Sequence, residues 1–208
     1  AKNMLESRGE SLKGKKCTVS GSGNVSIYTI EKLYHLGALP ITCSDSSGMI
    51  LDEEGIDLEL LKDLKENQRA RLTEYVKYRK NAKYIPVSDY PKGRNAVWSV
   101  PCFAAFPSAT QNELNLEDAK ELIKNGCICV SEGANMPSTN EAVDFFVAQK
   151  IAYGPGKAAN AGGVATSQLE MAQNASMVSW TFEEVDAKLE KIMKHIFDTA
   201  SATAKEFG

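Results

Sequence analysis

The stretch KCTVSGSGNVS, residues 16–26, decides the fold of this chain. A short β-branched run, residues 16–20, leads directly into the glycine-rich string GSGNVS, residues 21–26, and an amphipathic segment begins near Asn24. Such a turn between a strand and a helix lets backbone N–H groups at the helix N-terminus approach a pyrophosphate. The sixth position needs a small residue for close helix–strand packing, and Ser26 is small. The stretch predicts a dinucleotide-binding turn, with a plain glycine turn as the alternative.

Short β-branched or apolar runs alternate with amphipathic segments along the rest of the chain. The expected strands are residues 16–20, 39–44, 102–106, 127–130 and 151–154. This alternation predicts an α/β fold, a Rossmann-like doubly wound and mostly parallel sheet with helices on both faces and a long C-terminal helix. We expect one domain over residues 1–208, in which the proline-containing stretch 86–101 is a long connection.

Helix starts are marked by capping patterns. Ser138 with Glu141 and Thr181 with Glu184 fit the capping box, and Asn115 is expected to cap the helix that follows it. The last helix carries an apolar stripe at helical spacing, which predicts one buried face. The members of this stripe are Val185, Leu189, Ile192, Met193, Ile196, Phe197 and Ala200.

Composition excludes several classes of protein. The 208 residues contain 24 Lys and Arg against 27 Asp and Glu without a basic block, which argues against nucleic acid as the main partner. No apolar run approaches the roughly 20 residues of a membrane span. The five cysteines form no CxxC pattern, and all of them lie in the expected strand-like runs. They predict buried reduced thiols, a cytoplasmic location and no metal site.

The choice of cofactor stays open on the residues alone. Asp45 ends the second expected strand about two dozen residues after Gly21, the place of a carboxylate that binds the adenosine ribose of NAD. The neighbouring Ser46 and Ser47 offer hydroxyls to a 2′-phosphate instead. Positive charge from Lys65, Arg69 and Arg71 would favour NADP, although these residues equally fit a solvated helix face.

Several spaced blocks then identify a family. ATQN (109–112), EGANMPST (132–139) and KAANAGGVATSQLEMAQN (157–174), together with GSGNV and SDSSG, closely resemble the coenzyme-binding domain of hexameric glutamate dehydrogenases. The resemblance runs from about residue 4 to the end. Ser22 and Ser46 resemble the NADP-specific branch, which implies that Asp45 is turned away from the phosphate or protonated beside it.

The resemblance implies a role for each matched position. The pyrophosphate would lie on Gly21, Ser22, Gly23, Asn24, Val25 and Ser26. Ser46 and Lys65 would approach the 2′-phosphate beside Asp45. The crevice would be completed by Ala109, Thr110, Gln111 and Asn112 at the ribose and pyrophosphate, Gly133, Ala134 and Asn135 at the nicotinamide ribose, and Asn160 at the carboxamide. Val164 and Ser167 would face the substrate, with Ser167 donating to the side-chain carboxylate of glutamate or 2-oxoglutarate.

The resemblance places no catalytic residue in this chain. The substrate-activating lysines and the proton-shuttling aspartate would belong to an N-terminal substrate domain before Ala1, and the closing helices would follow Gly208. The parent protein would interconvert L-glutamate with 2-oxoglutarate and ammonia by hydride transfer, as a homohexamer. The chain alone would be a monomer that binds NADP without turnover.

Alternatives remain for each block and for the whole chain. ATQN also fits a strand-to-helix turn capped by Asn112, and Asn135 a turn before Pro137. The chain as a whole also fits an NAD-dependent glutamate dehydrogenase, a leucine- or phenylalanine-type dehydrogenase, or a non-catalytic nucleotide-binding module.

Overall fold

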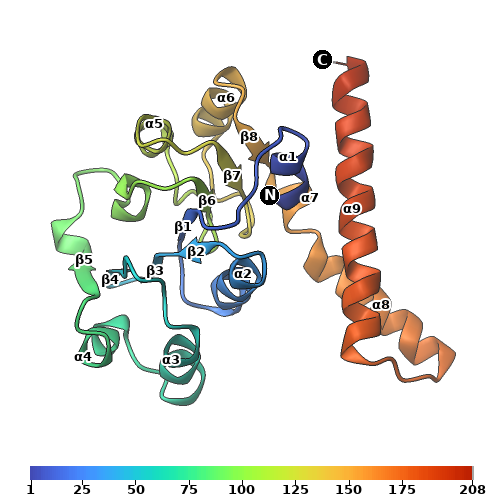
Figure 1. Cartoon of the computed structure of the whole chain (residues 1–208), viewed down its shortest axis with the longest axis horizontal. Helices are drawn as coiled ribbons and strands as arrows, with labels where there is room; N and C mark the ends of the chain where they lie inside the picture. Colours follow the sequence, from blue (N-terminus) through green and yellow to red (C-terminus); the bar gives the residue numbers. More distant parts are fainter. Residues whose placement is uncertain (208) are drawn as a thin grey trace. The chain divides into compact units, whose positions relative to one another are not determined.

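A computed structural model describes residues 1–207 (Figure 1). They form two compact units, residues 1–156 and residues 157–207. The first unit holds all the strands that the structure describes. The prediction of one domain over residues 1–208 stays a prediction, and each unit is described by itself.

The first unit is built on a five-stranded parallel sheet in the order β2-β1-β6-β7-β8. The five strands are β1 (Lys16–Val19), β2 (Leu39–Pro40), β6 (Ala104–Phe106), β7 (Cys129–Ser131) and β8 (Ala152–Gly154). From β1 the chain goes to β2 on one side, whereas β6 lies on the other side. The carboxyl ends of β1 and β6 therefore form a topological switch point, where open α/β sheets bind their ligands.

Helices cover both faces of this sheet, as the alternation predicts. Cys17, Val19 and Ala104 lie in a core cluster with residues of the first helices, whereas Ala105 and Val130 lie in a second cluster with later ones. The helices of the first group are α1 (Lys2–Glu6), α2 (Asn24–His35) and α3 (Leu58–Lys62), and those of the second are α5 (Leu116–Lys124) and α6 (Asn140–Ala148). The Rossmann-like doubly wound fold is confirmed.

A second sheet differs from the expected course of the chain. Residues 39–44, expected as one strand, form the whole of β2 and the start of β3 (Thr42–Asp45). β3 pairs antiparallel with β4 (Gly48–Leu51), which in turn pairs antiparallel with β5 (Lys83–Pro86). The chain leaves the parallel sheet at Ile41. Thr42 keeps β3 beside β1, because its Oγ1 accepts from Val19 N and donates to Val19 O, both at 2.9 Å.

Short helical turns connect the remaining strands of this unit. Between β4 and β5 lie α3, the π-helical turn η1 (Asp63–Asn67), the 3₁₀ turn η2 (Leu72–Glu74) and α4 (Tyr75–Tyr78). The expected long connection 86–101 contains two 3₁₀ turns, η3 (Val87–Asp89) and η4 (Ala96–Ser99). Trp98 is fully buried there, and its Nε1 donates to Glu113 O at 3.2 Å.

The second unit contains α8 (Gly162–Ser176) and α9 (Phe182–Phe207), preceded by the short α7 (Gly156–Ala159), which begins on the last residue of the first unit. The capping box at Thr181 is confirmed, because Glu184 accepts from Thr181 N and the Thr181 hydroxyl accepts from Glu184 N. The predicted stripe marks the half-buried face of α9, not a fully buried one. None of its described residues is fully buried, since α8 covers the stripe only in part and Ala200 is exposed.

The cap of α6 is displaced by one residue from the prediction. Thr139 is the N-cap and accepts from Ala142 N, whereas the buried Ser138 Oγ has no hydrogen-bond partner. Asn115 caps α5 as expected, with Asp118 completing its capping box. Ser138 occupies an isolated bridge with Leu114, which takes it out of the capping position.

This displacement gives a matched pair of substitutions. Thr139→Ala should lower the free energy of unfolding by about 1 kcal/mol, because it removes a cap acceptor. Ser138→Ala should cost less than about 0.5 kcal/mol, because it removes a hydroxyl that makes no bond. Urea unfolding of both variants measures the difference. A larger loss of stability from Ser138→Ala than from Thr139→Ala would show that Ser138 is the N-cap.

Candidate dinucleotide-binding site

The turn after β1 is held by internal hydrogen bonds. Gly21 has a φ of +83°, and its N–H donates to Ser44 Oγ on β3 at 2.8 Å. Ser26 is fully buried, and its hydroxyl donates to Ser20 O at 2.7 Å and contacts Ser108 O at 3.1 Å. Gly21 and Ser26 therefore fix the conformation of the predicted turn through buried hydrogen bonds.

Part of the same turn lies open to solvent at the start of α2. Gly23 is the N-cap, and Gly23, Asn24 and Val25 are exposed, whereas Ser22 is buried. A Cβ placed on Gly23 would meet no atom within 4 Å. The first N–H groups of a helix have no acceptor within it, so this end of α2 is suited to an anionic group.

A second loop meets the first at the switch point. Ser108 N donates to Ser20 Oγ at 2.8 Å, which ties the loop after β6 to the end of β1. Ala109, Thr110, Gln111 and Asn112 follow and are all exposed. The two predicted blocks are thus brought together across the neighbouring strands β1 and β6.

Glu113 orders the second loop. Its Oε1 accepts from Ala109 N at 2.9 Å and from Thr110 N at 3.3 Å. Burial raises its pKa, and these hydrogen bonds oppose the rise. Asn112 has a φ of +55°, and its N–H donates to Met136 O, so Asn112 links this loop to the one after β7. Asn115, and not Asn112, caps the helix that follows.

The carboxylate of Asp45, at the end of β3, accepts hydrogen bonds from within the protein. One carboxylate oxygen accepts from Ser47 N and Ser47 Oγ at 2.8 and 2.6 Å, and the other accepts from Leu72 N at 3.2 Å. Burial alone would raise the pKa of Asp45, but these hydrogen bonds and the charge of Lys65 bring it below the ordinary value. Of the two alternatives for Asp45, the structure favours an ionised carboxylate engaged within the protein over a protonated one.

Positive charge gathers beside the exposed Ser46. Arg71 Nη1 donates to Ser46 Oγ at 2.8 Å, and Lys65 Nζ donates to Ala70 O at 3.0 Å. The backbone N–H of Leu72, next to Arg71, is held by Asp45. The hairpin turn between β3 and β4 therefore presents a serine hydroxyl together with an arginine, a pair suited to a phosphate.

The loop after β7 comes close to the first turn. A Cβ on Gly133 would lie 2.8 Å from Ser108 Oγ and 3.2 Å from Val25 Cγ1, so a side chain there would collide with both loops. The N–H groups of Gly133 and Ala134 donate to Pro107 O at 2.8 and 3.0 Å. Asn135 is exposed beside them. Gly133 thus lies where three of the predicted blocks converge.

Glu132 was missed by the sequence reasoning. Its carboxylate is 3% exposed, and one oxygen accepts from Gly156 N at 2.6 Å, where α7 begins. Burial raises the pKa of Tyr153, and the neighbouring charge and hydrogen bond of Glu132 add to the rise. Glu132 thereby connects the ends of β7 and β8.

The remaining predicted residues belong to the second unit. Asn160 lies between α7 and α8, and Val164 and Ser167 lie on α8 one turn apart. Val164 is 66% exposed, and the exposed Ser167 donates to Gly163 O at 3.3 Å. Their roles toward nicotinamide and substrate stay predictions.

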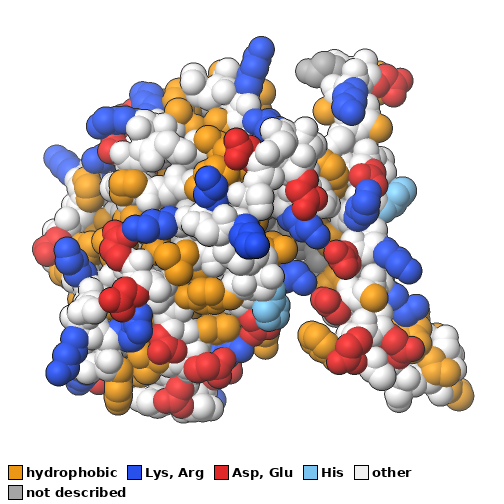
Figure 2. Space-filling model, in the orientation of Figure 1, with side chains coloured by type: hydrophobic (Ala, Val, Ile, Leu, Met, Phe, Trp, Pro, Cys, Tyr) orange, Lys and Arg blue, Asp and Glu red, His pale blue; other side chains and the backbone are white. Residues whose placement is uncertain are grey.

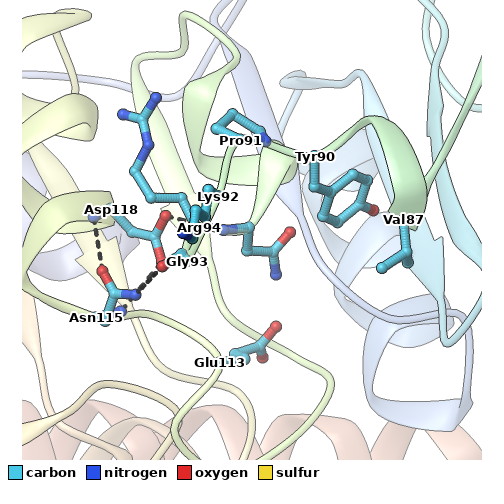
Figure 3. A pocket seen from close by; sticks show the side chains of 10 residues that line it. Val87, Tyr90, Pro91, Lys92, Gly93, Arg94, Glu113, Asn115 and Asp118 are labelled. Atoms are coloured by element: carbon cyan, nitrogen blue, oxygen red, sulfur yellow. Dashed lines mark hydrogen bonds between the residues drawn. The ribbon is translucent and has the colours of Figure 1, made fainter.

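A cavity of about 420 Å³ lies next to the second loop (Figure 3). Figure 3 shows Tyr90, Glu113 and Asp118 reaching it from three different segments. Asp118 is 1% exposed and accepts from Asn115 N and Asn95 N at 3.2 and 3.0 Å. Burial raises its pKa to about 6, against these hydrogen bonds and the charge of Arg94.

The raised pKa of Asp118 predicts a pH-dependent stability. The folded chain binds this proton more tightly than the unfolded chain, so this contribution to stability falls as pH rises from about 4 to about 6. Relative to Asp118→Asn, the free energy of unfolding of the unchanged chain should increase by roughly 2–3 kcal/mol between pH 7 and pH 4. Urea unfolding at several pH values measures this, with the exposed Asp144→Asn as control. A profile that Asp118→Asn leaves unaltered would contradict it.

Charges and metal ligands give no sign of another kind of site. Figure 2 shows Lys and Arg side chains mixed with Asp and Glu over the visible face. Within residues 1–207, no group of three or more His, Cys, Asp or Glu side chains could hold a metal ion. No helix in the described part of the chain has the length and apolarity to span a membrane. The five cysteines are buried, as predicted, and none is in a disulfide.

A family model for glutamate, leucine, phenylalanine and valine dehydrogenases matches residues 1–208. The chain belongs to this family of amino acid dehydrogenases. The NADP-specific glutamate dehydrogenase of Helicobacter pylori strain J99 is 65% identical over 207 residues, which are 100% of this chain and 46% of that protein. The NAD(P)-specific glutamate dehydrogenase of Xylanibacter ruminicola is 54% identical over 202 residues, 93% of this chain and 43% of that protein.

Solved structures of the dehydrogenase family agree. The crystal structure of Plasmodium falciparum glutamate dehydrogenase matches with a TM-score of 0.91 and 47% identity, covering 98% of this chain and 43% of that one. This dehydrogenase chain thus spans less than half the length of the relatives it matches.

The candidate site also contains structural residues outside the predicted set. Ser20, Ser44 and Ser108 hold the two loops together, and Glu113 orders the second of them. The hydroxyls at the ends of three strands were a visible signal in the sequence, but their partners come from other strands and loops. Glu113 directly follows ATQN and gave no separate signal.

Proposed function

We propose that this chain is the NADP(H)-binding part of a glutamate dehydrogenase, which interconverts L-glutamate with 2-oxoglutarate and ammonia. The observation that carries the proposal is the pair of Ser46 and Arg71 beside the switch point, with Asp45 held inside the protein. An Asp45 carboxylate turned toward the ribose would repel a 2′-phosphate. The printed names of the curated relatives support the same cofactor.

The residues at the switch point fit a dinucleotide. Open space at Gly23 leaves room for a pyrophosphate at the N-terminus of α2, and the absence of a side chain on Gly133 lets its loop approach Ser108 and Val25 closely. The 2′-phosphate would be bound by Ser46 and Arg71, with Lys65 adding positive charge nearby. Bound nicotinamide supplies the hydride chemistry.

The other residues would orient the two reactants. Gly21 and Ser26 hold the turn rigid, and Glu113 fixes the backbone from Ala109 to Asn112 beside the ribose and pyrophosphate. Gly133, Ala134, Asn135 and Asn160 would fix the nicotinamide end. Val164 and Ser167 would face the substrate, where a serine donor suits the side-chain carboxylate of glutamate better than an aliphatic side chain.

The acid–base groups of the reaction would come from the rest of the protein. We propose a cytoplasmic homohexamer for the whole enzyme, and a monomer for this chain, which gel filtration would test. The five buried, reduced thiols support a reducing compartment.

The first test is a titration of the chain with NADPH and NADH, followed by nucleotide fluorescence. We expect NADPH to bind at least about tenfold more tightly, with a margin that shrinks at raised salt. With ammonia and 2-oxoglutarate added, NADPH should not be consumed by the chain alone. Equal binding of the two nucleotides would contradict the NADP assignment, and turnover would contradict the assignment of acid–base residues to another part of the protein.

A further inference from the structure

Two buried cysteines lie side by side at the amino ends of neighbouring strands. The register of β6 and β7 pairs Ala104 with Cys129, and Ile128 N donates to Phe103 O at 3.0 Å just before that pair. Cys102 and Cys127 each lie two residues before these strands, and their side chains interact directly. Both side chains belong to the same core cluster, on one face of the sheet.

The hydrogen bond between Ile128 and Phe103 keeps the two backbones at strand spacing, within the reach of a disulfide. Neighbouring strands lie about 4.8 Å apart, and the Cα atoms of disulfides are usually about 4.4–6.8 Å apart. The other described cysteines do not meet this condition. Cys17 and Cys129 flank Ala104 from opposite sides, about two strand spacings apart, and Cys43 lies on β3 in the other sheet.

The two thiols differ in reactivity. Thr18 Oγ1 lies 3.3 Å from Cys102 Sγ, to which it donates, whereas Cys127 Sγ donates to Cys129 O at 3.3 Å. Interaction with Cys127 lowers the pKa of Cys102 against the effect of burial, and Thr18 adds to the lowering. The pKa of Cys127 is raised by Cys102 and by burial. The Cys102 sulfur accepts a hydrogen bond whereas the Cys127 sulfur donates one, so Cys102 has the greater thiolate character and is the nucleophile that reacts first.

We propose that Cys102 and Cys127 are a peroxide-oxidisable pair that closes to a disulfide in the folded protein. The Cys102 thiolate attacks one oxygen of a hydroperoxide, here H₂O₂. The O–O bond breaks, and the released hydroxide takes up a proton to leave as water. The resulting sulfenic acid, Cys102–SOH, is attacked by the Cys127 sulfur. The S–S bond forms, the S–O bond breaks, and a second water leaves with the Cys127 proton.

The pair lies at the amino edge of the sheet, opposite the edge of the dinucleotide turn. The inference is therefore independent of the proposed function. The disulfide would join the starts of β6 and β7 across α5, a closed loop that restricts the unfolded chain.

Mass spectrometry tests the pairing. The chain is treated with H₂O₂ under native conditions, alkylated and digested without reductant. We expect one cross-link, between the Cys102 and Cys127 peptides, reversed by dithiothreitol. An unfolded chain would instead favour Cys127 with Cys129, which is two residues away. A dominant link to Cys17, Cys43 or Cys129, or sulfinic and sulfonic acids without a cross-link, would overturn the proposal.

Cysteine variants test which two thiols form the cross-link and which of them reacts first. Cys102→Ser and Cys127→Ser should each abolish the cross-link, whereas Cys43→Ser, equally buried, should leave it. In Cys127→Ser, dimedone should label Cys102 as sulfenic acid. Thr18→Val should slow cross-linking several-fold, and its circular dichroism should match that of the unchanged chain. A cross-link that persists in Cys102→Ser would overturn the assignment. The oxidised chain should melt at a higher temperature than the reduced chain, and an equal or lower melting temperature would contradict the native fit.

Discussion

Gly21→Ala should lower the free energy of unfolding by at least about 3 kcal/mol. The φ of +83° at this residue is strained for any L side chain. An added Cβ would lie 2.3 Å from Ser26 Oγ, 3.0 Å from Ser108 O and 3.2 Å from Ala109 Cα. The variant would have to move Ser26, whose hydroxyl holds the turn to both strands, so NADPH binding should be lost together with stability.

Substitution of a second glycine separates the effect of backbone strain from the effect of the steric clash at Gly21. Gly14 has a φ of +72°, but a Cβ there would meet no atom within 4 Å. Gly14→Ala should therefore show only the strain of the backbone, about 1–2 kcal/mol. Urea unfolding of both variants, with NADPH titration of the folded fraction, measures the difference. Equal losses of stability would mean that the turn accommodates a side chain and that its close packing is not essential.

Arg71→Ala should weaken NADPH binding about tenfold and leave NADH binding within about twofold. The guanidinium reaches Ser46 Oγ at the hairpin turn, and a 2′-phosphate in that place would accept from both. Since the interaction is between charges near the surface, the loss should shrink as salt is raised. Fluorescence titration with both nucleotides at two salt concentrations measures it.

The matched control is Arg69→Ala. Arg69 is two residues away, exposed and of the same charge, so its removal reports the general effect of positive charge on nucleotide binding. If both arginine variants weaken NADPH binding equally, the effect comes from the change in net charge. If Arg71→Ala weakens NADH as much as NADPH, Arg71 does not distinguish the two cofactors.

The sequence was sufficient for the parallel sheet and its principal turn. Residues 16–26 combine a β-branched run, glycines and a helix start, all of which depend on neighbours in the chain. The switch from β2 to β3 within residues 39–44 was not predictable in this way. The β-branched pattern continues through Ile41, while the strand partners change from β1 to β4.

Some features of the candidate site were predictable from the sequence, and others were not. Exposed backbone positions such as Gly23 and the 109–112 loop follow from local motifs. The hydrogen bonds of Ser26, Ser44 and Ser108 do not, because each joins segments far apart in the sequence. Asp45 shows the same limit. Its position was found from spacing, but its partners Ser47 and Leu72 decide its charge state.

Helix faces were the least reliable prediction. The stripe on α9 has the spacing of a buried face, but burial depends on what covers it, and within its own unit α8 covers it only in part. The cap of α6 was displaced from Ser138 to Thr139 because both residues are good caps and the bridge of Ser138 to Leu114 decides between them.

The division into two sheets has a consequence for how cofactor choice is inherited. The glycine-rich turn, which we propose binds the pyrophosphate, directly follows β1 of the parallel sheet, while Ser46 is on a two-residue hairpin turn of the antiparallel sheet. A surface hairpin tolerates exchange far more readily than a close-packed strand end. Descendants of one ancestral gene could therefore swap one dinucleotide for the other by rewriting a few positions of that hairpin. The close-packed turn after β1 would be passed on unaltered.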